Sequence, residues 1–172
     1  MDQERVKIPQ LIPFEEVVRI AKETVLRDGY HLPTLVVEGS REPAILQIAG
    51  LANTHEGRVV QLYSAGVELG LGGQLGRLRQ VILVTEGWMS MGQDGQEPVL
   101  PPSLDPNRKE VLIIAGHNLT LDQTQMVLFG MVRNKRQKLI GLTDLTRSNT
   151  GVQEGESLLL QAFIQGYQRS RK

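Results

Sequence analysis

Residues 81–84, Val-Ile-Leu-Val, are the apolar run that most constrains the fold of this chain. Side chains of a β-strand point alternately to its two faces, so a strand that is apolar at every position needs cover on both sides. The run therefore predicts a central strand over residues 79–88. Glu86 and Gly87 follow the run, and Trp88 is the only tryptophan in the chain.

Apolar residues at helical spacing predict three helices. The first begins after Pro13 and ends at Gly29, since proline suits a first helical turn and glycine suits a C-terminus. The second has Asn53 as its expected cap and ends near Gly70, and Gly66 within it predicts a close approach of another element. The third is marked by Leu159, Phe163 and Tyr167.

Short apolar stretches between turn residues predict six strands. They cover residues 33–39, 43–50, 79–88, 109–116, 124–132 and 138–145. The first two form an expected hairpin and the last three an antiparallel meander. A long loop over residues 92–108 separates the central strand from this meander, and residues 146–155 form an expected linker to the last helix.

This order of elements, α-β-β-α-β-β-β-β-α, predicts an α+β fold in one domain, residues 1–172. A mostly antiparallel sheet of five or six strands would have about three helices packed against it. The order resembles the roadblock, longin and profilin-like scaffolds, in which a hairpin, a helix and a meander form one sheet. Such a fold-level likeness implies no function.

Charge and cysteine content narrow the classes of function. Lys plus Arg and Asp plus Glu both number 19, so no overall charge attracts the protein to nucleic acid or to an anionic membrane. The absence of cysteine excludes disulfides and thiolate chemistry. The mixed charge of the first ten residues does not fit a signal peptide, and the apolar runs are too short to span a bilayer. We therefore expect a cytoplasmic protein without a membrane partner.

Polar residues at strand ends provide one candidate catalytic site. Glu86 is expected to share a face with apolar side chains, which would raise its pKa and fit it for general acid or base catalysis. Glu38 and His117 also follow apolar strands. If the three met at one sheet edge, they could perform proton transfer under a lid formed by residues 92–108. A strand end reaching solvent is the alternative interpretation.

The basic segment at residues 133–138 provides a second candidate site. Arg133, Lys135 and Arg136 lie in an expected hairpin turn and could contact phosphates together with the basic residues at 169–172. No aromatic residues are interleaved to stack on bases, so nucleic acid is a disfavoured partner. The glycine-rich stretch at residues 70–76 follows a helix and precedes a strand, which is the wrong direction for a dinucleotide fingerprint.

Three stretches are similar to a group of small bacterial proteins without an assigned function. They are RDGYHLPTLVVEG, VTEGWMSM and DPNRKEVLIIAG. The resemblance implies that Trp88 and residues 105–110, including Asp105 and Arg108, form one shared feature and gives a candidate binding site there. It implies no activity.

The sequence leaves three functional hypotheses open. The leading one is a non-enzymatic domain that binds another protein or a second copy of itself through its sheet or a sheet edge. The others are an acid–base enzyme such as a hydrolase and a nucleic-acid-associated protein. The histidines have no zinc-type spacing, so no metal or cofactor is predicted.

Overall fold

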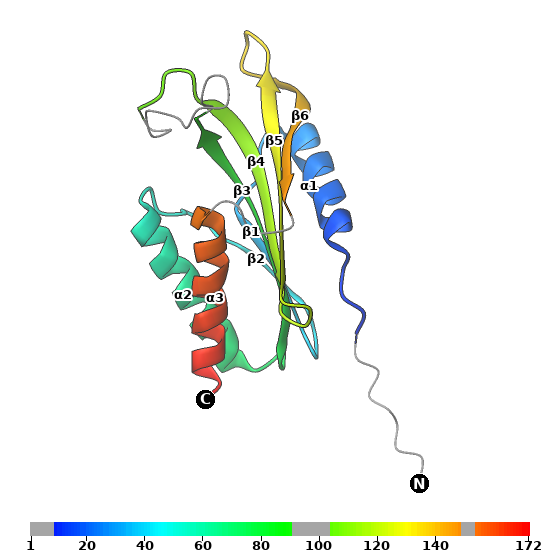
Figure 1. Cartoon of the computed structure of the whole chain (residues 1–172), viewed down its shortest axis with the longest axis vertical. Coiled ribbons are helices and arrows are strands. Elements are labelled where there is room, and N and C mark those ends of the chain that lie inside the picture. The colour runs from blue at the N-terminus through cyan, green and yellow to red at the C-terminus, as the bar shows by residue number, and fades with distance from the viewer. Residues whose placement is uncertain (1–8, 91–103, 149–153) are drawn as a thin grey trace.

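The computed structural model describes residues 9–90, 104–148 and 154–172, and it has the predicted α+β architecture (Figure 1). The predicted order of elements is confirmed. The elements are α1 (Phe14–Asp28), β1 (Thr34–Gly39), β2 (Ala44–Gln47), α2 (His55–Gly72), β3 (Leu78–Met89), β4 (Lys109–Asn118), β5 (Gln123–Arg133), β6 (Leu139–Ser148) and α3 (Glu154–Ser170).

The six strands form one sheet in the order β2-β1-β3-β4-β5-β6, and every neighbouring pair is antiparallel. β3 lies inside the sheet, between β1 and β4. Its four apolar residues 81–84 are buried. The central strand predicted from the apolar run is therefore confirmed, as is the meander that continues from β4 to β6.

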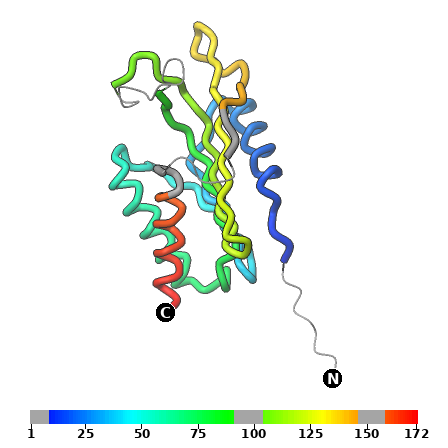
Figure 2. Tube along the Cα trace, in the orientation of Figure 1, coloured from blue at the N-terminus to red at the C-terminus, as the bar shows by residue number. Residues whose placement is uncertain are grey.

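Helices cover both faces of this sheet and make three layers, with α2 and α3 on one side and α1 on the other (Figures 1 and 2). Alternation along β3 divides its side chains between two cores. Val81 and Leu83 join the core beneath α2 and α3. Ile82 and Val84 join the core beneath α1. The apolar run is thus explained by burial on both sides.

Helices α2 and α3 lie parallel and in close contact (Figure 1). A Cβ atom on Gly66 would collide with the carbonyl oxygen of Phe163, and one on Gly166 would collide with that of Tyr63. Glycine therefore allows the two backbones to approach where any side chain would separate them. The close approach predicted at Gly66 is confirmed.

Helix α1 has the predicted ends. It begins after Pro13, and Gly29 ends it with a left-handed φ of 82° while its amide donates to the carbonyl of Val25. The buried side chains of α1 form one stripe along the sheet. They are Val17, Val18, Ala21 and Val25. The start and end of α1 therefore lie over opposite ends of one sheet face.

Two predicted boundaries are wrong. The cap of α2 is Thr54, whose hydroxyl oxygen accepts from the amide of Gly57 at 3.1 Å, and Asn53 lies one residue too early to cap it. β6 pairs with β5 as far as Ser148, and α3 begins at Glu154, so half of the expected linker at residues 146–155 belongs to these elements. Most of the expected 92–108 loop lies outside the described residues.

Candidate functional site

Glu86 lies where β3 runs past the end of β1. The pairing of β1 with β3 ends at Thr34 and Val84, so residues 85–89 of β3 have no β1 residue beside them. The chain between α1 and β1 occupies this place, and the amide of His31 donates to Glu86 Oε1 at 2.5 Å. Glu86 is therefore held at the rim of the sheet, on the face that α1 covers.

The surroundings of Glu86 raise the pKa of its carboxyl group above the usual value. Burial is the largest cause, because it disfavours the charged form, and the negative charge of Glu110 adds to it. The amide of His31 and the positive charge of Arg133 act in the opposite direction. The raised pKa expected for Glu86 is confirmed in direction.

Arg133 forms a two-pronged ion pair with Glu110. Its Nε and Nη2 atoms donate to the two carboxylate oxygens at 2.6 and 2.7 Å, and Nη2 also donates to the carbonyl of Gly29 at 3.0 Å. The guanidinium thus joins β4 and β5 to the end of α1. A group held in this way is an internal tie, and its donors face protein oxygens instead of a nucleic-acid backbone.

Trp88 is 51% exposed, although it lies within a strand. The guanidinium of Arg108 stands 4.4 Å from the centre of its ring. A turn brings Arg108 there, because the carboxylate of Asp105 accepts from the amide of Asn107 and its carbonyl accepts from the amide of Arg108. The structure therefore brings Trp88, Asp105 and Arg108 together, the three residues of the candidate binding site.

Two further exposed apolar side chains lie in the segment that contacts Glu86. Tyr30 is 55% exposed and Leu32 is 47% exposed, and they flank His31, whose amide binds Glu86 two residues before Trp88. We call Tyr30, Leu32, Trp88 and Arg108 the Trp88 surface. The ion pair of Glu110 and Arg133 lies next to this surface, because Trp88 pairs with Glu110 across β3 and β4 and because Tyr30 and Arg133 line one hollow.

The predicted catalytic group of Glu38, Glu86 and His117 does not exist as a shared site. Glu38 pairs with Gln80, which is six residues from Glu86, or about 20 Å along an extended strand. His117 pairs with Val81, about 16 Å along β3 from Glu86, and alternation places its side chain on the opposite face of the sheet. The prediction of an acid–base trio at one sheet edge is therefore wrong.

Glu38 and His117 each have a local role instead. Both oxygens of Glu38 accept hydrogen bonds, Oε1 from the amide of Ile12 at 2.8 Å and Oε2 from Gln80 Nε2 at 2.7 Å. His117 Nδ1 lies 2.9 Å from the hydroxyl of Thr124, its cross-strand partner. Glu38 ties the segment before α1 to the sheet, and His117 supports the β4–β5 hairpin.

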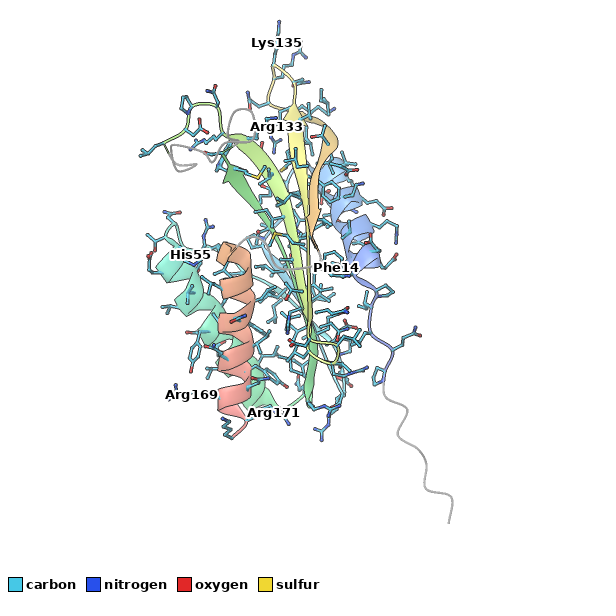
Figure 3. All side chains as sticks on the ribbon, in the orientation of Figure 1. Phe14, His55, Arg133, Lys135, Arg169 and Arg171 are labelled. Carbon is cyan, nitrogen blue, oxygen red and sulfur yellow. The ribbon has the colours of Figure 1, made fainter. Side chains whose placement is uncertain are left out.

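The basic residues do not form one surface. Lys135 lies at the tip of the β5–β6 turn, whereas Arg169 and Arg171 lie at the opposite end of the molecule, on α3 and just beyond it (Figure 3). Arg136 is exposed in the same turn as Lys135, but Arg133 is paired with Glu110. The expected cooperation of the basic turn with the basic tail is therefore wrong.

Sequence reasoning missed Glu110 and His31 as neighbours of Glu86. The signal for Glu110 was alternation, because Glu110 and Leu112 share a face of β4 and Leu112 pairs with Glu86. Using that signal requires the register between the two strands. His31 contacts Glu86 through its backbone amide, which no side-chain pattern reveals.

Within the described ranges, no three histidine, aspartate or glutamate side chains are placed to hold a metal ion. No helix among the same residues is long and apolar enough to cross a bilayer.

Comparisons of the chain with protein-family models, with curated proteins and with solved structures gave no match. The resemblance of the three stretches to small bacterial proteins, and of the element order to roadblock, longin and profilin-like scaffolds, remains a prediction. The contacts of the Trp88 surface are therefore the basis on which a function is proposed.

Proposed function

We propose that this chain is a non-enzymatic protein-interaction domain that binds its partner, another protein or a second copy of itself, through the Trp88 surface. The observation that carries the proposal is the half-exposed ring of Trp88 beneath the guanidinium of Arg108. Tryptophan, tyrosine and arginine are the residues that contribute most often to binding energy at protein interfaces. Cytoplasmic location is part of the same proposal.

The neighbouring charges fit this role. Glu110 and Arg133 satisfy each other, so a partner covering Trp88 would not leave either of them buried without a counter-charge. The exposed rings of Tyr30 and Trp88 offer apolar area whose removal from water favours association by about 25 cal/mol per Å². The surface therefore combines apolar contact area with an ion pair that is already formed.

The edges of the sheet are less suited to binding by strand addition. β2 has only four residues, and Pro43 precedes it. β6 is longer, but its pairing with β5 skips Ile140 and Leu145, which marks a bulge at each of them. Short and bulged edge strands are the devices by which proteins prevent edge-to-edge pairing. This favours a side-chain surface over a sheet edge as the place of contact.

Trp88 itself provides the test, because it is the only tryptophan and reports on no other place. If the partner is a second copy, raising the protein concentration should move its fluorescence to shorter wavelength while light scattering shows a doubled mass. If neither changes, the partner is a different protein. The wild-type chain should then retain from source lysate a protein that the Trp88→Ala variant does not retain. That partner, once purified, should bind the wild-type chain and not the variant.

Leu71→Ala is a matched control, because Leu71 is also exposed but lies at the end of α2 on the other side of the sheet. It should associate as the wild-type chain does. The proposal is wrong if Trp88→Ala and Leu71→Ala have the same mass distribution and retain the same proteins as wild type.

The raised pKa of Glu86 favours one alternative, an acid–base enzyme such as a hydrolase. Such an enzyme would use Glu86 without Glu38 and His117. It predicts a hydrolytic activity that Glu86→Gln abolishes and Trp88→Ala retains in part. A nucleic-acid role would rest on the exposed Lys135 and Arg136. It predicts a salt-dependent shift with RNA or DNA that replacement of both residues abolishes, and a shift that survives would exclude this turn as the contact surface.

A further inference from the structure

A cavity of about 200 Å³ lies at the other end of the sheet face that α1 crosses, between the segment before α1 and strands β3, β4 and β5. Phe14, at the start of α1, is part of its wall (Figure 3). We call this cavity the amide pocket, because four carboxamide side chains contribute to its lining. They are Gln80, Asn118, Gln123 and Gln125.

Strand register places these groups side by side. Glu38 pairs with Gln80, Gln80 with Asn118, and Asn118 with Gln123, so one polar row crosses four strands. Side chains directly opposite each other on neighbouring strands have Cβ atoms about 5 Å apart. The row lies where β4 ends and β5 begins, at one end of the sheet face beneath α1, and it contributes to the lining of the cavity.

Gln80 has a fixed orientation. Its Nε2 donates to Glu38 Oε2 at 2.7 Å and to the carbonyl of Ile12 at 2.8 Å, and both of these atoms only accept. The amide nitrogen therefore has to face them. Its carbonyl oxygen, Oε1, receives no hydrogen bond from any described residue, although the residue is only 7% exposed. Gln80 thus offers the pocket a fixed acceptor.

Asn118 is fixed in the opposite sense. Its Oδ1 accepts from the amides of Thr120 and Leu121, both at 3.0 Å, in the turn between β4 and β5. The carbonyl oxygen therefore has to face the turn. Its Nδ2 makes no hydrogen bond with any described residue. Asn118 thus offers a fixed donor beside the fixed acceptor of Gln80.

We propose that the amide pocket binds a neutral, planar six-membered ring with a cis-amide edge, such as a pyrimidine base. In such an edge an N–H and a C=O point the same way. The N–H would donate to Gln80 Oε1, and the C=O would accept from Asn118 Nδ2. The carboxamides of Gln123 and Gln125 make no hydrogen bond with described residues, so they remain able to bind other polar atoms of the ring.

Size and charge support this class of ligand. An engineered cavity of about 150 Å³ holds one benzene ring, so about 200 Å³ admits one six-membered ring with substituents. The edge of the Phe14 ring lies against Gly116, where a Cβ would come within 3.0 Å of it. Glu38 accepts with both oxygens from the protein itself. Within the described residues the pocket therefore offers aromatic and amide groups without a charge for the ligand to pair with.

The test uses uracil, which has the cis-amide edge, and 1,3-dimethyluracil, in which methyl groups replace both N–H donors. The expected result is saturable binding of uracil in an NMR titration, with shifts of the Gln80 and Asn118 side-chain amide signals, and at least tenfold weaker binding of dimethyluracil. A saturated lactam, 2-piperidone, should bind with intermediate strength. The proposal is overturned if uracil leaves these signals unmoved at millimolar concentration or binds no better than dimethyluracil.

Asn118→Asp is the decisive variant, because the carboxylate can still accept from the turn amides while the Nδ2 donor becomes an acceptor. It should lose at least tenfold in affinity for uracil. Asn134→Asp is its matched control, since Asn134 Oδ1 accepts from the amides of Arg136 and Lys138 in the same way, in the β5–β6 turn. It should bind uracil as wild type does. Equal affinity of the two variants would overturn the proposal.

Discussion

The two ends of the sheet face beneath α1 use polar residues in opposite ways. At the end of α1, Glu110 and Arg133 neutralise each other, and the exposed groups around them are the rings of Trp88 and Tyr30. At its start, Glu38 is satisfied within the protein, and the groups left with hydrogen-bonding capacity are amides in a cavity. The first end is suited to a broad apolar contact and the second to a small polar molecule. At both ends the charged side chains bind other groups of the protein. The side chains that remain exposed, or that keep hydrogen-bonding capacity, determine what each end can bind.

The largest effect on stability is expected when the ion pair of Arg133 and Glu110, near the end of α1, is broken. Arg133→Ala leaves Glu110 partly buried beside Glu86, and we expect the free energy of unfolding to fall by about 3 kcal/mol, the cost of an uncompensated charge. Urea denaturation measures it. Adding Glu110→Gln should recover much of the loss, whereas Arg136→Ala, at the exposed turn, should change stability by less than about 0.5 kcal/mol. Equal losses for Arg133→Ala and Arg136→Ala would contradict the assigned role.

At the start of α1, loss of the Glu38 carboxylate should also lower the stability of the protein. Glu38→Ala removes the acceptor of the Ile12 amide and one of the two acceptors of Gln80 Nε2, and we expect a loss of about 2 kcal/mol in the free energy of unfolding. Hydrogen exchange at the Ile12 amide should become faster than in wild type. Glu42→Ala, in the exposed β1–β2 turn, is the control and should leave both measurements unchanged. Unchanged protection at Ile12 would show that Glu38 does not hold this segment.

The contribution of Glu86 to stability should depend on pH, which gives a further test of the end of the sheet face near the end of α1. Because folding raises its pKa, Glu86 contributes most favourably below the pKa of the unfolded carboxyl, and this contribution is lost as pH rises through the folded pKa. The stability of wild type relative to Glu86→Gln should therefore fall from acid to neutral pH. Thermal unfolding of both proteins across this pH range measures the difference in their stability. Groups that titrate identically in the two proteins do not contribute to this difference. A relative stability that rises with pH would contradict the raised pKa.

The smallest effect on stability is expected at Trp88. Because its ring is half exposed, Trp88→Ala should cost about 1 kcal/mol or less, whereas replacement of a buried aromatic such as Phe163 by alanine costs about 3–5 kcal/mol. The same substitution should abolish association. Calorimetry measures the loss of stability, and light scattering measures the loss of association. A core-sized loss of stability in Trp88→Ala would identify the ring as structural.

Local patterns predicted the elements and the cover on both faces of β3. Proline and glycine at the ends of α1, apolar alternation along the strands and Gly66 each act over a few residues, so the sequence displays them directly. The candidate site depended on register. Glu38 and Glu86 look alike as polar residues after apolar strands, yet the antiparallel pairing of β1 with β3 places Glu38 beside Gln80, six residues along β3 from Glu86.

Arg133 is a second residue whose role the sequence pattern did not predict. In the sequence it belongs to a basic segment with Lys135 and Arg136, which suggests one charged surface. Its strand position places it beside Glu110 and the end of α1, so it serves a different purpose from its neighbours. The orientation of Gln80 and Asn118 was equally hidden, because it depends on Ile12 and on the turn amides.

The glycine contact between α2 and α3 has a consequence for synthesis on the ribosome. Gly66 and Gly70 weaken α2 as an isolated helix, by about 1 kcal/mol each, and the contact that compensates is made by residues translated much later. Phe163 and Tyr167 are also the fully buried side chains through which α3 closes this side of the sheet. A nascent chain that lacks α3 therefore exposes the apolar face of its sheet to water and to chaperones until that helix has been synthesised.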